Sequence, residues 1–107
     1  MTGTRLDTFR AMVAKSPSNV LARFGLANEL LKAQLWGEAE EHLRAYLEGY
    51  DDEGNGHGRH AEALEALGRR TEAAEALRRG IAAAHRFGHP SMANELRERL
   101  DVLEDSE

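Results

Sequence analysis

Residues 20–48, VLARFGLANELLKAQLWGEAEEHLRAYLE, contain two amphipathic segments separated by a short break at 34–37. On both sides of the break, apolar residues recur at three- and four-residue steps, which is the spacing of one face of an α-helix. The sequence therefore predicts two helices joined by a tight turn. Trp36 lies at this turn, and we expect its ring to pack between the two helices rather than to bind a ligand.

The same pattern returns when the sequence is shifted by 34 residues. The matched pairs are Ala27 with Ala61, Leu30 with Leu64, Ala39 with Ala73, Leu43 with Leu77 and Leu47 with Ile81. A self-match at one fixed period of this length is typical of proteins built from stacked helical repeats.

The period and the alternation of small and large apolar residues resemble the tetratricopeptide repeat, a helix–turn–helix unit. The resemblance covers about residues 5–87, and Pro17 lies where a unit of this family usually ends. It implies an all-α fold of antiparallel helix–turn–helix repeats, stacked as a short right-handed α-solenoid of about five helices with a C-terminal capping helix. Ala39 and Ala73 would begin the second helix of each pair, where a larger side chain would push the pair apart.

We expect a single domain over residues 1–107. A half-repeat helix at 5–15 would precede the first repeat at 20–48, with Asn19 or Ser18 as its N-cap. The segment 49–59 is rich in glycine, so we expect the first helix of the second repeat, 57–87, to be short or frayed and to begin near His57. Thr71 would cap the next helix. A capping helix at 90–104 would follow, with Pro90 in its first turn.

Composition narrows the classes of protein to which the chain can belong. It has 107 residues, of which 41% are apolar and 31% charged, as in a folded protein with amphipathic helices. Without cysteine, it can form neither disulfides nor a thiolate zinc site. A net charge of −5 argues against nucleic-acid binding. No apolar run reaches the length of a membrane span and no signal-peptide core is visible, so we expect a cytoplasmic protein without membrane contact.

Two features of residues 51–62 could bind a cation. The series Asp51, Glu53, Asn55, Gly56 and Glu62 lies near the calcium-loop pattern D-x-[DN]-x-[DN]-G-x5-E. The alternative is an acidic connector that matches by chance. His57 and His60 are spaced to face one way on a helix, but a transition metal would need a third ligand that the sequence does not place beside them. We therefore predict no metal ligands, and keep a calcium- or metal-responsive loop as a weaker alternative.

The sequence contains no catalytic motif. No nucleophile lies in an elbow motif, and no glycine-rich phosphate loop joins a strand to a helix. The carboxylates instead occur at the spacing of solvated helix faces, as at Glu38 and Glu41. We expect a protein that is not an enzyme and has neither catalytic residues nor a cofactor.

A binding protein is therefore the predicted class. The resemblance implies that a peptide or helix of a partner protein lies against the concave side of the repeat stack. The side chains implied for that side are Leu21, Phe24, Asn28, Leu31, Lys32, Glu62 and Glu65. Two alternatives remain open. Leu21, Phe24 and Leu31 could pack in the core. Alternatively, the apolar surface around Leu21 and Phe24, or an open end of the stack, could pair with a second copy of the chain in a homodimeric scaffold.

Overall fold

The computed structural model describes residues 4–106, which form six α-helices and no strand. The helices are α1 (Arg5–Lys15), α2 (Val20–Lys32), α3 (Trp36–Gly49), α4 (Asn55–Ala66), α5 (Arg70–Arg86) and α6 (Pro90–Asp105). The all-α prediction is confirmed for these residues, while the outer ends of the expected domain, 1–3 and 107, lie outside them. None of the described helices is long and apolar enough to cross a membrane.

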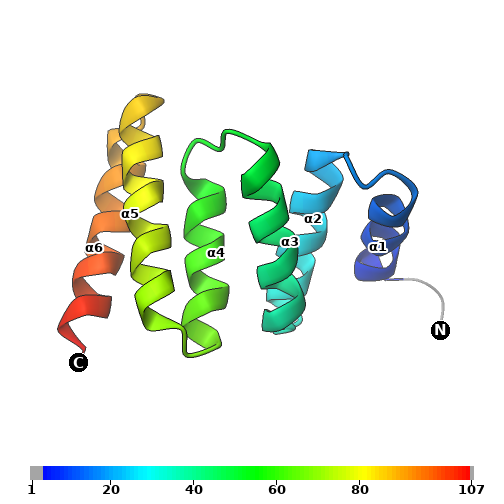
Figure 1. Ribbon diagram of the computed structural model, residues 1–107, viewed down its shortest axis with the longest axis horizontal. Helices are drawn as coiled ribbons and strands as arrows, with labels where there is room; N and C mark the ends of the chain where they lie inside the picture. The colour runs from blue at the N-terminus through cyan, green and yellow to red at the C-terminus, as the bar shows by residue number, and fades with distance from the viewer. Residues whose placement is uncertain (1–3, 107) are drawn as a thin grey trace.

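The helices follow one another along the long axis of the molecule, from α1 at one end to α6 at the other (Figure 1). Each helix packs mainly against the next one in sequence, and α2 makes a further small contact with α4. The molecule is accordingly elongated, with principal extents of 43 × 30 × 20 Å. In such an arrangement most residues depend on neighbours nearby in sequence, and several helix faces stay open to solvent.

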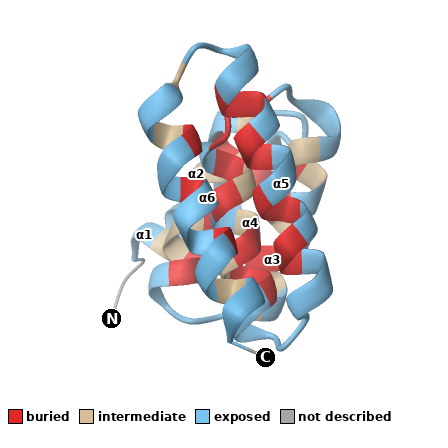
Figure 2. Cartoon of the chain, turned by 90° about the vertical axis from the view of Figure 1, so that its left-hand side faces the viewer, coloured by how far each residue is buried: buried red, intermediate tan, exposed pale blue. Residues whose placement is uncertain are grey.

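Buried residues, red in Figure 2, lie on the sides of the helices that face one another. Their apolar members form two clusters. The first cluster joins α1, α2 and α3, and the second joins α4, α5 and α6. Ala63 of α4 belongs to the first cluster, whereas Ala61 and Leu64 belong to the second. Helix α4 therefore connects the two halves of the core.

In four of the five pairs matched at the 34-residue spacing both residues are buried, whereas Leu47 is only half-buried and its match Ile81 is buried. Ala27, Ala61, Ala39 and Ala73 are all 0% exposed. Leu43 and Leu77 are also among the largest fully buried side chains. Small residues occupy the closest helix contacts and leucines fill the space beside them, which is the arrangement that the sequence pattern predicts.

The predicted helix ends are partly correct. The Oδ1 of Asn19 accepts a hydrogen bond from the backbone N–H of Ala22 at 3.1 Å and so caps α2. Pro90 occupies the first turn of α6 as expected. The prediction for Thr71 is wrong, because α5 begins at Arg70 and Thr71 lies inside its first turn.

Helix α4 begins at Asn55, earlier than the predicted start near His57, because Asp52 orders the residues before it. Oδ1 of this buried carboxylate accepts hydrogen bonds from the backbone N–H groups of Gly54 and Gly56, each at 2.7 Å. Its Oδ2 accepts the hydroxyl of Tyr46 at 2.7 Å. The glycine-rich segment is therefore a capped helix start rather than a frayed one.

Candidate partner-binding surface

The predicted residues Leu21 and Phe24 lie on α2, near the carboxyl-terminal end of α3. Phe24 is half-buried and stacks on Tyr46 with ring centroids 4.8 Å apart, and Tyr46 contacts Tyr50 at 5.3 Å. Burial, together with the neighbouring carboxylate of Asp52, raises the pKa of the Tyr46 phenol, so this hydroxyl stays protonated. Leu21 is 75% exposed. These residues form an apolar and aromatic edge that begins at an exposed leucine.

Leu31 is a correction to the predicted surface. Its side chain is 5% exposed and belongs to the apolar cluster of α1, α2 and α3. A partner could not reach it without opening that cluster. Periodicity alone gave α2 two apolar sides, and it did not show that the second side is covered near the carboxyl-terminal end of the helix.

Asn28 and Lys32 complete the predicted set on α2. Lys32 is exposed, and its Nζ lies 3.3 Å from Oε2 of Glu29. The same oxygen accepts a hydrogen bond from Nε of Arg5 at 3.2 Å. The Oδ1 of Asn28 is inaccessible to solvent and has no hydrogen-bond partner among the described residues. A buried acceptor without a hydrogen-bond partner costs about 1–3 kcal/mol of folding stability.

The two predicted residues of α4, Glu62 and Glu65, lie beside α6 rather than beside the predicted residues of α2. Each lines a groove whose other wall is α6. Their neighbours across it include Glu95, Arg99 and Val102, none of which the sequence analysis selected. The spacing of Glu95, Arg99 and Val102 at four- and three-residue steps could have indicated a shared exposed face of α6.

The α4–α6 groove is narrow at one end and wide at the other. At the narrow end, a cavity of 160 Å³ lies beside Gly58. A Cβ on Gly58 would be 3.0 Å from Leu96 and 3.1 Å from Arg99, so glycine lets the two helices approach closely here. At the wide end, the cavity is 600 Å³ and is bordered by Glu65, Glu98 and Val102. The groove therefore opens toward the carboxyl-terminal ends of α4 and α6.

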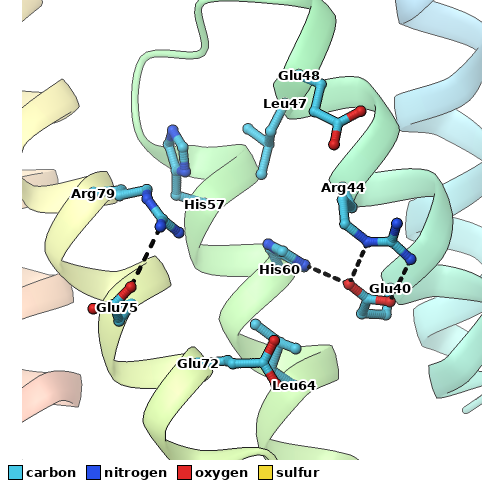
Figure 3. Close-up of a pocket in the computed structure, with 10 residues that line it drawn as sticks. All are labelled: Glu40, Arg44, Leu47, Glu48, His57, His60, Leu64, Glu72, Glu75 and Arg79. Carbon is cyan, nitrogen blue, oxygen red and sulfur yellow. Dashed lines mark hydrogen bonds and ion pairs between the residues drawn. The ribbon is translucent and has the colours of Figure 1, made fainter.

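A second groove of 410 Å³ lies between α3 and α5, with His57, His60 and Leu64 of α4 as its floor (Figure 3). These α4 residues form one stripe along the helix, and Gly58, Glu62 and Glu65 form another, so the two grooves lie on different sides of α4. Arg44 and Glu48 stand on the α3 wall, and Glu75 and Arg79 on the α5 wall.

The polar centre of the second groove is Glu40, whose side chain is only 4% exposed. Its carboxylate accepts a hydrogen bond from Nε of Arg44 at 3.1 Å and lies 3.0 Å from Nε2 of His60, as Figure 3 shows. The guanidinium of Arg69 lies 3.6 Å from the same carboxylate. Burial would raise the pKa of Glu40, but the hydrogen bonds from Arg44 and His60 outweigh it and hold the pKa at about 2. Glu40 is therefore an ionised connector of α3 to α4 and to the α4–α5 turn.

The possible cation ligands at 51–62 take part in other contacts. Oδ1 of Asp51 accepts a hydrogen bond from Arg86 at 2.7 Å, and Oε1 of Glu53 lies 2.9 Å from Nε2 of His89. Asp52 is used by Tyr46 and by backbone N–H groups. Across residues 4–106, no three His, Asp or Glu side chains gather as metal ligands would. The calcium-loop pattern, which was the weaker alternative, is not assembled as a cation site among these residues.

A comparison with known proteins finds a solved structure with a similar fold but gives no information on function. The chain is similar to the solution structure of protein BPP2914 from Bordetella parapertussis, a structural genomics target, with a TM-score of 0.82 and 27% sequence identity. The similarity covers 97% of this chain and 90% of that one. No family model and no curated protein matches the sequence. The name of the similar protein states neither a ligand nor an activity.

Proposed function

We propose that this chain is a non-catalytic interaction module of the tetratricopeptide-repeat type, in which helix pairs form a short right-handed α-solenoid that binds a peptide or helix of a partner protein. The burial of both residues in four of the five pairs matched at the 34-residue spacing supports the repeat assignment. The packing of each helix on its sequence neighbours supports it further.

The observation that carries the binding function is the open α4–α6 groove. Its wide end combines a 600 Å³ cavity with Val102, which is 70% exposed, and with the partly buried Leu103. An apolar surface beside polar groups and within a concave region is typical of sites that bind short segments of other proteins. The exposed Leu21 and the aromatic residues next to it are the second part of the proposed surface.

The ion pairs in the second groove, between α3 and α5, favour a binding function over catalysis. Glu40, Arg44 and His60 contact one another, and Arg69 is held by Glu72 at 2.7 Å. Side chains used in this way stabilise the contacts between helices, whereas a general acid or base needs a proton position open to a substrate. We expect no enzymatic activity, no cofactor, and a cytoplasmic location that cell fractionation would test.

Affinity capture from the native lysate, read by mass spectrometry, tests the proposal. The baits are the unaltered protein, Leu21→Glu, Val102→Glu, and Phe87→Glu as a control at an exposed apolar residue elsewhere. Proteins lost with Leu21→Glu or Val102→Glu but kept with Phe87→Glu support the proposed surface. Identical captured sets for all four folded baits would contradict it.

A second copy of the chain is the alternative occupant of this surface. Light scattering at micromolar concentration distinguishes it: a dimer that Leu21→Glu or Val102→Glu converts to a monomer would replace the partner hypothesis by self-association. A monomer for all variants leaves the partner as the occupant.

A further inference from the structure

We infer that the α4–α6 groove binds a positively charged, amphipathic segment of its partner, with lysine or arginine side chains on its carboxylates and an apolar side chain against Val102. This inference rests on the proposed function and names the chemistry of the ligand. It starts from the charges that line the wide end of the groove.

Three carboxylates at that end have no cationic partner within the described part of the chain. They are Glu65 on α4 and Glu95 and Glu98 on α6. Some other carboxylates are paired: Glu38 accepts a hydrogen bond from Arg10 at 2.7 Å, and Glu104 accepts one from Arg78. The exposed Glu41 and Glu48 on α3 have no ion pair among residues 4–106, but they lie outside this groove. The distinguishing feature of Glu65, Glu95 and Glu98 is that all three line one cavity of 600 Å³, where a single ligand could contact them together.

The one cation at the wide end does not neutralise them. Nη2 of Arg99 donates to the backbone carbonyl of Gly58 at 3.1 Å, and no carboxylate lies within ion-pair distance of it among residues 4–106. Arg99 is thus directed toward the narrow end, against the backbone of α4. Three carboxylates against one guanidinium leave the wide end with an excess of negative charge, which attracts a basic ligand and repels an acidic one.

The groove also has an apolar part, so charge is not its only recognition element. Val102 lies one helical turn from Glu98, on the same face of α6, and Leu103 borders the same cavity. A segment that presents basic and apolar side chains at this interval would place cations on Glu95 and Glu98 and an apolar group on Val102. A uniformly charged ligand would leave Val102 in water, so the groove prefers an amphipathic segment.

Fluorescence anisotropy with a defined set of peptides tests the inference. The probe is a short fluorescein-labelled peptide of repeating Lys-Leu-Ser units, compared with peptides in which glutamate or glutamine replaces every lysine. We expect the lysine peptide to bind most tightly. The double variant Glu95→Gln, Glu98→Gln should weaken that binding about fivefold, because two exposed ion pairs are lost.

The matched control is Glu41→Gln, Glu48→Gln, which removes the same charge from exposed carboxylates on α3. Equal weakening by the two double variants would show attraction to the net charge alone and would overturn the inference. Circular dichroism confirms that all variants are folded.

The peptide set separates failure of the inference from failure of the proposed function. If the glutamate or glutamine peptide binds most tightly and Val102→Glu abolishes its binding, the groove binds partners but the charge assignment is wrong. If no peptide binds and affinity capture shows no protein that depends on Val102, the groove is not a binding site and both proposals fail. Val102→Ser gives a second readout: it should weaken binding of the lysine peptide without altering the charge of the groove.

Discussion

Nε2 of His60 on α4 lies 3.0 Å from Oε2 of Glu40 on α3, and both side chains are largely buried between these helices. This pair bridges the point at which the two apolar clusters meet. A carboxylate that is nearly inaccessible to solvent can stay ionised only while its partners remain in place. The ionised Glu40 therefore adds a polar contact to the apolar packing of α3 on α4.

Replacing Glu40 by glutamine should destabilise the protein by about 3 kcal/mol, because Arg44, His60 and Arg69 then lose a shared anionic partner in a largely buried site. Urea denaturation followed by circular dichroism measures the change. The control is Glu41→Gln, an exposed neighbour whose replacement should alter the free energy of unfolding by less than about 0.5 kcal/mol. Equal effects of the two substitutions would contradict the role of Glu40.

The stability that Glu40 provides should depend on pH. Its pKa is lowered from 4.5 to about 2 in the folded protein, so the folded state binds the proton less readily than the unfolded state does. This contribution is fully present above pH 4.5 and is lost as the pH falls toward 2. The difference in unfolding free energy between the unaltered protein and Glu40→Gln should shrink across that interval. A difference that stays constant down to pH 2 would contradict the assignment.

Two glycines in helices should respond to alanine with opposite signs. A Cβ on Gly56 would lie 2.7 Å from the ring of Tyr46 and 2.8 Å from Oδ2 of Asp52, both of which are held by their mutual hydrogen bond. Gly56→Ala should therefore destabilise the protein by about 1–3 kcal/mol. Gly37 in α3 has no atom within 4 Å of the same position, so Gly37→Ala should stabilise it by about 0.5–1 kcal/mol. Stabilisation by both substitutions would show that Gly56 is not a close contact.

The glycines also show where sequence reasoning was limited. Residues 49–59 suggested a flexible connector, because glycine lowers helix propensity and nothing in the pattern showed what would pack there. The structure uses Gly56 and Gly58 for close approach to Tyr46 and Leu96, and Asp52 supplies the cap. Contacts between residues far apart in sequence decide such positions, and a local pattern does not contain them.

The helices themselves were predictable because their apolar spacing is local. The candidate surface was predictable only in part: Leu21 is exposed as required, whereas Leu31, with an equally favourable spacing, is covered by the core. The α6 wall of the groove was not predicted, because that helix had been assigned a capping role. Its Glu95, Glu98 and Val102 gain meaning only when α4 is known to lie across the groove.

The difference between Leu21 and Leu31 gives a direct test of which part of α2 is core. Leu31→Ala should cost about 2–5 kcal/mol of unfolding free energy, since it leaves a cavity in the first apolar cluster. Leu21→Ala should change it by less than about 0.5 kcal/mol, because that side chain is already 75% exposed. Thermal denaturation of the two variants measures both values, and similar losses would mean that Leu21 is buried in solution.

Asn28 offers a test in which stability and binding should change in opposite directions. Its Oδ1 is buried without a hydrogen-bond partner among the described residues, so Asn28→Leu, which keeps the side-chain shape and removes the polar atoms, should raise the free energy of unfolding by about 1 kcal/mol. Asn94→Leu is the control, because Asn94 is exposed on α6 and shares only the gain in helix propensity. If the amide contacts the partner, Asn28→Leu should bind it more weakly despite being more stable. A loss of stability in Asn28→Leu would mean that the amide is paired in solution and is a structural group.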